Sequence, residues 1–175
     1  MSVRRWSQRS LGNMEGIHPH LRAVMDAALH ASPVDFTVIE GLRTRERQAQ
    51  LMAGGNSRTM NSRHLTGHAV DLMPIDPATG RGSFDWPLYH RLAPAVKAEA
   101  ERLGIPITWG GDWTRFRDGP HFELAWHDYP ADAPWPDAGP VVAAVARPVP
   151  TPESEPAPTG WAALVAAILR LFRRD

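Results

Sequence analysis

The stretch SRHLTGHAVDL, residues 62–72, joins a turn-prone segment to a short alternating one. The alternation in HAVDLMP predicts a strand that carries Asp71 on one face and apolar side chains on the other. His64 lies seven positions earlier, in the segment that leads into this strand. A second such segment, DGPHFEL at residues 118–124, places another carboxylate and another histidine at the start of another short strand.

The other patterns up to residue 127 alternate between helix and strand. Residues 56–64 show no periodicity and are predicted to form an exposed loop. Pro94 is expected to kink or divide the long helix in which it lies. The predicted elements are a helix over residues 17–31, a strand over 35–41, a helix from Thr44 to Gly54, a helix over 85–104, and strands in IPITWGG and HFELAW.

The composition narrows the chemistry. Lysines and arginines number 19, as do aspartates and glutamates, so no net field favours nucleic acid, and we expect no nucleic-acid partner. The 175 residues include no cysteine, so any metal must be held by imidazole and carboxylate groups. The first twenty residues contain arginines without a following apolar run, which predicts a soluble cytosolic chain without a signal peptide.

The texture changes after residue 127. Nine of the 17 prolines fall between Tyr129 and Pro158, which predicts an extended linker over residues 128–159. Residues 160–175 form a short amphipathic segment of apolar residues that ends in arginines. At ~1.5 Å per residue this segment is too short to cross a bilayer, which needs ~20 residues. It is therefore expected to lie on a membrane or lipopolysaccharide surface, to dock on the protein, or to fray.

Four side chains in the two quoted stretches have the composition of a catalytic zinc site. Such a site takes three ligands from His, Asp and Glu and leaves one position open. His64, Asp71 and His121 supply two imidazoles and a carboxylate, and Asp118 offers a base that does not bind the metal. Spacing alone leaves open that these are ordinary pairs, because a histidine beside a carboxylate is common on protein surfaces.

The same residues carry a resemblance to a known family. SRHLTGHAVDL and GGDWTRFRDGPHFEL are similar to the two metal-binding motifs of the zinc D-Ala-D-Ala metallopeptidases, over roughly residues 15–126. This family includes D,D-carboxypeptidases and phage L-alanyl-D-glutamate endolysins. The resemblance implies Zn2+ bound by His64, Asp71 and His121, with Asp118 as the catalytic base. It also implies an α+β domain over residues 1–127, with a small, mostly antiparallel sheet that has helices on one face, as in Hedgehog-like domains.

Three further residues enter through the resemblance. GLRTRERQ, residues 41–48, is similar to the family segment whose arginine reaches the active site, so Arg43 is expected to contact substrate carboxylate or the oxyanion. Ser62 matches a serine close to the metal, although a turn residue that bonds its own backbone is an equal reading. Trp113 is expected to line the substrate groove, with core filling as the alternative.

These features together predict a zinc-dependent peptidase of peptidoglycan stems, a monomeric phage endolysin that cuts between L-Ala and D-Glu. It would wait in the host cytoplasm until lysis and then act on the wall in the periplasm. The alternatives are a D-Ala-D-Ala carboxypeptidase or dipeptidase, and a non-catalytic zinc domain that binds the cell wall. Asp118 argues against the last of these, because a structural zinc site needs no base.

Overall fold

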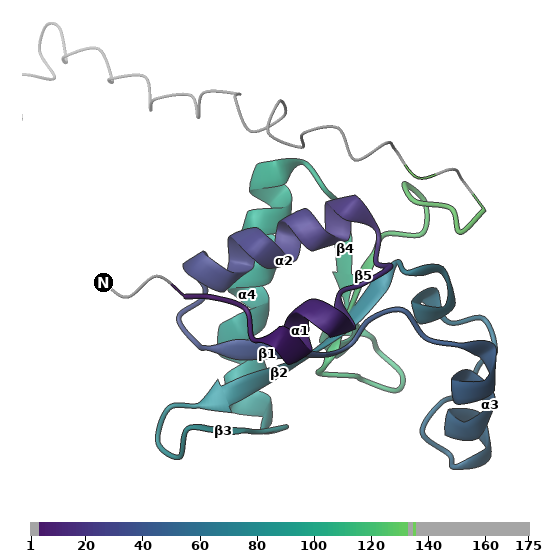
Figure 1. Cartoon of the computed structure of the whole chain (residues 1–175), viewed down its shortest axis with the longest axis horizontal. Coiled ribbons are helices and arrows are strands. Elements are labelled where there is room, and N and C mark those ends of the chain that lie inside the picture. Colours follow the sequence, from purple (N-terminus) through teal and green to yellow (C-terminus); the bar gives the residue numbers. More distant parts are fainter. Residues whose placement is uncertain (1–3, 133–134, 136–175) are drawn as a thin grey trace, which may run out of the picture. The chain divides into compact units, whose positions relative to one another are not determined.

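The computed structural model describes residues 4–132 and residue 135. Helices and strands are interspersed along this part of the chain (Figure 1). The α-helices are α1 (Gln8–Asn13), α2 (Pro19–Ala31), α3 (Arg45–Ala53) and α4 (Trp86–Leu103). The strands are β1 (Phe36–Glu40), β2 (Ala69–Asp76), β3 (Arg81–Gly82), β4 (Ile107–Trp109) and β5 (His121–Leu124), with 3-10 turns η1 (Arg63–Thr66) and η2 (Gly110–Asp112).

The sheet is antiparallel in every pair and has the order β1-β2-β5-β4, with β3 paired to β2. Strand β2 therefore lies between β1 and β5, and its residues face partners on both sides. Asp71 is opposite His121 on β5 and opposite Glu40 on β1, beyond a register shift after Val38. Residues directly opposite each other on adjacent strands project from the same face. The register thus brings three polar side chains from three strands into one row.

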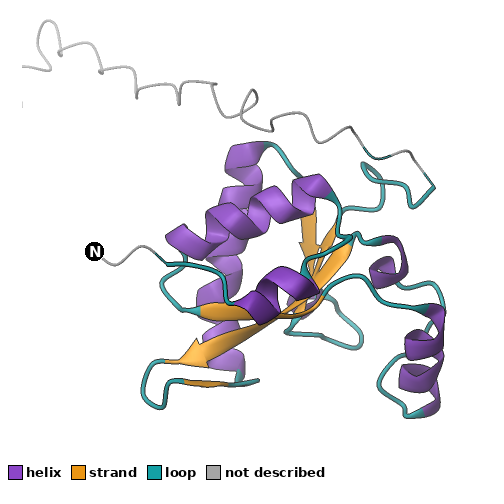
Figure 2. Cartoon of the chain, viewed as in Figure 1, coloured by secondary structure: helices purple, strands orange, loops and turns teal. Residues whose placement is uncertain are grey.

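The other face of the sheet packs against α2 and α4, whereas α3 stands away from these two helices (Figures 1 and 2). The predicted alternation in β2 is confirmed, because Val70 and Leu72 are fully buried while Asp71 points to the opposite face. The core of this layer is built by Phe36, Val38, Val70, Leu72, Phe122 and Leu124 of the sheet and Leu21, Val24, Met25, Ala28, Tyr89, Leu92, Ala93 and Val96 of the helices. The predicted fold class, α+β with helices on one face, is confirmed.

Two local features differ from the sequence patterns. α4 runs without a break through Pro94, which is exposed, so the carbonyl that loses its helical partner can be hydrated while the buried face holds the helix together. α1 was not expected, because it is short and buries only Ser10 among its own residues. It is fastened to β1 by polar contacts, including a 2.7 Å hydrogen bond between the hydroxyls of Ser10 and Thr37 and a 2.8 Å bond from Asn13 Nδ2 to the carbonyl of Val38.

Two predictions concern the end of the chain. Tyr129, beyond the expected domain boundary at residue 127, still packs on the core and lies 2.9 Å from His20 through its hydroxyl. The structure describes residues 128–132 and 135 of the expected linker (128–159). The other residues of this linker and the expected amphipathic helix (160–175) lie outside the described residues. Within the described part, none of the helices combines the length and apolar character that a bilayer crossing requires.

The two faces of β2 should respond differently to truncation. Leu72→Ala removes a fully buried side chain from between sheet and helices and is expected to lower the free energy of unfolding by about 2–5 kcal/mol. The matched variant Met73→Ala, on the half-buried opposite face, should lose on the order of 1 kcal/mol. Urea denaturation followed by circular dichroism measures both, and equal losses would contradict the assignment of the core face.

Candidate metal centre and active site

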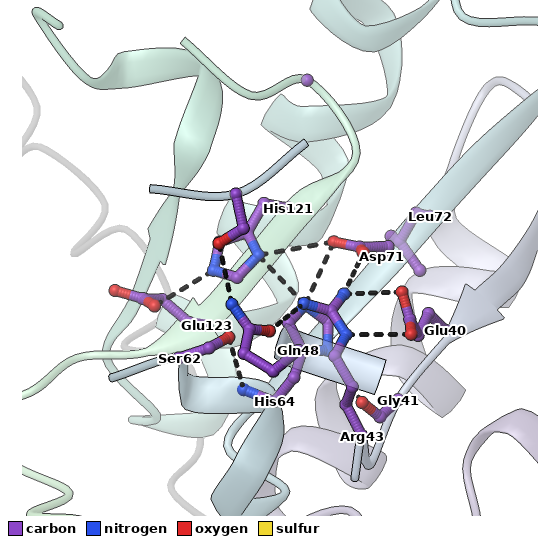
Figure 3. Close-up of polar contacts among 12 residues, drawn as sticks. Glu40, Gly41, Arg43, Gln48, Ser62, His64, Asp71, Leu72, His121 and Glu123 are labelled. Carbon is purple, nitrogen blue, oxygen red and sulfur yellow. Dashed lines mark hydrogen bonds and ion pairs between the residues drawn. The ribbon is translucent and has the colours of Figure 1, made fainter. Parts of the chain in front are cut away.

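Three side chains from distant parts of the sequence converge at the centre of the polar face (Figure 3). His64 Nε2 lies 3.2 Å from His121 Nδ1, and each of these nitrogens lies 3.3 Å from Asp71 Oδ1. The three atoms therefore form a nearly equilateral triangle. Ligands at ~2.0–2.1 Å from a tetrahedral metal are separated from each other by about 3.3 Å. The triangle has the size that a metal ion with a fourth, open position requires.

The backbone accounts for this convergence. Asp71 and His121 are register partners on β2 and β5, so the sheet itself sets their side chains next to each other. His64 comes from η1, the 3-10 turn that precedes β2. Ser62 caps that turn, because its hydroxyl accepts a hydrogen bond from the backbone N–H of His64. Gly67 ends the turn with φ of 68°, a left-handed conformation that suits glycine.

The tautomer of His64 is set by a glycine. His64 Nδ1 donates a 2.7 Å hydrogen bond to the carbonyl oxygen of Gly41, which leaves Nε2 with a lone pair that points into the triangle. Gly41 itself lies against the end of α1. A Cβ at position 41 would collide with the carbonyl of Asn13 and with the side chain of Ile17. The glycine of the segment GLRTRERQ is therefore required for the close approach that presents its carbonyl to His64.

The tautomer of His121 is set by a residue that the sequence analysis missed. His121 Nε2 donates a 3.0 Å hydrogen bond to Glu123 Oε2, so Nδ1 is the nitrogen that faces the triangle. Glu123 is buried and also accepts a 3.1 Å bond from Trp126 Nε1. The signal was present in the sequence, because residues two apart on a strand share a face and HFE therefore places the carboxylate beside the histidine.

The electrostatics of the triangle favour a cation. Asp71 Oδ1 is buried and receives no hydrogen bond. Burial alone would raise the pKa of Asp71, but the adjacent His64 and His121 outweigh it and hold that pKa far below its usual range. Two lone pairs and a carboxylate oxygen in contact repel each other unless a positive charge lies between them. The donor set and the orphaned oxygen thus fit a bound metal ion.

The pKa of His121 also indicates that the triangle favours a positive charge. Burial lowers its pKa, but hydrogen bonds and charge from Asp71 and Glu123 raise it to about 9. A metal ligand must be a neutral imidazole, so a metal ion at this position replaces a proton that the two carboxylates attract. The carboxylates of Asp71 and Glu123, on either side of the ring, thus stabilise a positive charge at His121, either a proton or a metal ion.

Asp118 lines the same groove as the three ligands. Burial and the nearby negative charge of Asp71 raise its pKa above the usual value of an aspartate. The backbone N–H of Asp118 donates a 3.0 Å bond to the carbonyl of Gly110, which fixes the turn that leads into β5. A Cβ on Gly110 would press on Asp118 and His121, so this glycine permits the close approach. A carboxyl group whose pKa lies closer to neutrality suits proton transfer.

Arg43 reaches the site but is largely occupied. Nε and Nη2 donate to the two carboxylate oxygens of Glu40 at 2.9 and 2.5 Å, Nη1 donates to Gln48 at 2.8 Å, and Nη2 also contacts Asp71 Oδ2 at 3.3 Å (Figure 3). Four of its five N–H groups are thus used. In this arrangement Arg43 orients Asp71 from behind. Its expected contact with substrate stays a prediction.

The two remaining expected site residues also lie at the groove, which has a volume of about 260 Å³. Ser62 lines the groove while it caps η1, so the two readings of this serine are compatible. Trp113 lines it too, with its ring 5.2 Å from that of His121. His68, which follows η1, is buried away from the groove against His18 and Trp135.

An antiparallel sheet with a His, Asp and His centre and a separate carboxyl group in one groove defines the class of D-Ala-D-Ala-type metallopeptidases, as the sequence motifs suggested. Residues 1–125 match the family described as phage L-alanyl-D-glutamate peptidase, and the chain belongs to this family.

The individual relatives agree with the family match. The L-alanyl-D-glutamate peptidase of Escherichia phage T5 is 31% identical over 120 residues, which cover 65% of this chain and 85% of that enzyme. The enzyme of the same name from Listeria phage A118 is 32% identical over 127 residues, 71% of this chain but only 43% of that protein's length. The crystal structure of the Serratia marcescens L-Ala D-Glu endopeptidase ChiX matches with a TM-score of 0.67 and 46% identity, over 73% of this chain and 94% of ChiX.

Loss of the Glu123 carboxylate should weaken the metal centre without removing a ligand. In Glu123→Ala the proton on Nε2 of His121 loses its acceptor, so the imidazole is less firmly oriented, and affinity for zinc should fall about 10–100-fold. Competition with a chromogenic chelator measures this affinity. The matched control Glu99→Ala removes a carboxylate that pairs with Arg102 on α4, and it should leave zinc affinity unchanged. Equal affinity in both variants would refute the orienting role of Glu123.

Proposed function

We propose that the protein is a zinc-dependent peptidoglycan peptidase that hydrolyses the bond between L-Ala and D-Glu of the peptide stem. The observation that carries this proposal is the triangle of His64, Asp71 and His121 in a groove that also holds Asp118. Imidazole and carboxylate ligands without thiolate, at the spacing of a tetrahedral ion, suit zinc in a catalytic site. The names of the relatives support the choice of scissile bond.

Each residue of the site has a separate role in the proposed hydrolysis. His64, Asp71 and His121 would hold a zinc ion, which would supply polarisation of the scissile carbonyl and lower the pKa of water to about 7. Asp118 accepts the proton of the attacking water and delivers it to the amine that leaves. Arg43 and Glu123 act behind the ligands, the first on Asp71 and the second on His121. The raised pKa of Asp118 fits a group that must both take up and release a proton.

Two alternatives use the same groove. A D-Ala-D-Ala carboxypeptidase would perform the same hydrolysis on the C-terminal D-alanine, and it is distinguished by its product. A non-catalytic wall-binding domain would need the metal for stability only. The raised pKa and groove position of Asp118 favour a catalytic domain, because a structural zinc site is closed and needs no separate acid or base.

The role of Asp118 can be separated from metal binding. Asp118→Asn keeps the size of the side chain but cannot accept the proton, so turnover is expected to fall about a hundred- to ten-thousandfold. Zinc content, measured by atomic absorption after dialysis, should stay at one ion per chain. The control Asp112→Asn changes an exposed aspartate that pairs with Lys97, and it should keep full activity. Undiminished turnover in Asp118→Asn would rule out this residue as the base.

The products of wall digestion identify the bond. Purified sacculi treated with the enzyme should release fragments with new D-Glu amino termini and L-Ala carboxyl termini, detected by mass spectrometry. A chelator should stop the release and added zinc should restore it, because the metal is required for hydrolysis. Free D-alanine with intact L-Ala–D-Glu bonds would instead establish the carboxypeptidase. Absence of any zinc-dependent product would favour the wall-binding domain.

A further inference from the structure

The groove is lined by two guanidinium groups in opposite situations. Arg43 has a side chain only 8% exposed, and its donors are directed at Glu40, Gln48 and Asp71. Arg58 is exposed and forms no ion pair with any carboxylate of residues 4–132 and 135. The cation that remains available to a ligand in the groove is therefore Arg58.

Arg58 is held in a defined place by an aromatic ring from the opposite loop. Its Cζ lies 4.4 Å from the centroid of Phe116, which belongs to the segment between η2 and β5, whereas Arg58 follows α3. A guanidinium that stacks through its flat face keeps its N–H groups at the edge, where they can bind a carboxylate in two-point fashion. The stack positions the cation without using up its donors.

Phe116 has an unusual backbone for such a residue. It has φ of 55°, and it is the one non-glycine residue with positive φ among those that the structure describes. Its side chain is nevertheless 47% exposed at the groove. A bulky residue in the left-handed region is strained, and strained backbone conformations cluster at ligand sites. A large exposed ring held in this way, with Arg58 stacked upon it, indicates a role at the groove and not in the core.

The loop that carries Arg58 is tied to the metal centre by one buried side chain. Gln48 is fully buried, and its amide oxygen accepts the hydrogen bond from Arg43. Its amide nitrogen donates to Ser57 Oγ at 2.7 Å and to the carbonyl of Thr59 at 2.6 Å. Both residues that flank Arg58 are thereby fixed relative to the ligands.

The other charged groups of the groove indicate which kind of ligand Arg58 can bind. Glu40, Asp71 and Asp118 place three carboxyl groups along its wall, and Arg43 answers the first two. A zinc ion at the triangle would compensate Asp71 beside the scissile bond, and Arg58 would supply the positive charge for a substrate carboxylate that lies elsewhere in the groove. Glutamate within a peptide stem carries two carboxyl groups, of which the chain uses one, so the other remains as a carboxylate unless it is amidated.

We propose that Arg58, stacked on Phe116, is the specificity residue that binds the free carboxylate of the substrate glutamate. This assignment rests on the proposed cleavage next to that glutamate. It gives Arg43 and Arg58 separate tasks, the first behind the metal ligand Asp71 and the second in front of the substrate. It also predicts that the enzyme prefers stems whose glutamate is not amidated.

Two synthetic stem peptides test the assignment. They differ only in whether the free carboxyl group of D-Glu is a carboxylate or a carboxamide. The wild-type enzyme should cleave the carboxylate peptide with a kcat/KM about ten- to a hundredfold higher, the value expected for a charge-assisted two-point bond. In Arg58→Gln this preference should vanish through loss on the carboxylate peptide alone. The control Arg45→Gln, an exposed arginine of α3 that is not among the groove-lining residues, should keep the preference.

The outcomes separate this inference from the proposed function. Cleavage of both peptides by the wild type, with the same preference kept in Arg58→Gln, overturns the role of Arg58 and leaves the peptidase intact. Cleavage of neither peptide at the L-Ala–D-Glu bond rejects both. Phe116→Leu keeps the cation and removes the ring, so its preference should fall less than that of Arg58→Gln. A preference that vanishes in Phe116→Leu but persists in Arg58→Gln would make the ring the binding element and overturn the assignment to Arg58. Unchanged melting temperatures confirm that each variant is folded.

Discussion

The site depends on the forced proximity of three electron-rich atoms. His64 Nε2, His121 Nδ1 and Asp71 Oδ1 lie within 3.3 Å of one another, and the other nitrogen of each ring is committed to an acceptor. Without a cation this arrangement is repulsive, and the backbone must hold it. Several features of the surrounding backbone supply this constraint. The sheet register positions Asp71 and His121, the capped 3-10 turn positions His64, and Gly41 and Gly110 permit the close backbone approaches around the two histidines.

The orienting acceptors differ in kind, and the difference has a physical meaning. His64 donates to a neutral backbone carbonyl, whereas His121 donates to the carboxylate of Glu123. An anionic acceptor raises the basicity of its imidazole more than a carbonyl does, which makes His121 the stronger donor to a metal. The buried charge of Glu123 is in turn satisfied by Trp126. The centre is therefore asymmetric. The carboxylate of Glu123 both orients His121 and raises its basicity, whereas the carbonyl of Gly41 mainly orients His64.

The sequence made some of this predictable. The alternation in HAVDL placed Asp71 opposite the core face, and the glycine, proline and histidine of DGPHFEL marked a turn into a strand. What no local pattern contains is the pairing of residue 71 with residue 121, because register is a property of two strands and the shift after Val38. Glu123 was missed although the period of a strand would have found it. Pro94 misled because its local cost is smaller than the packing of the helix around it.

The position of Gln48 shows how the rest of the groove is made consistent with the metal centre. The buried amide of Gln48 accepts a hydrogen bond from Arg43 and donates to the loop that carries Arg58. The positions of both guanidinium groups therefore depend on this one side chain. An amide suits this position because it has both an acceptor and donors, while a carboxylate would offer only acceptors. A shift of α3 would therefore move the orienter of Asp71 and the cation at the groove together. Through Gln48, the position of Arg58 at the groove is therefore linked to the position of the metal ligand Asp71. This link requires no direct contact between Arg43 and Arg58.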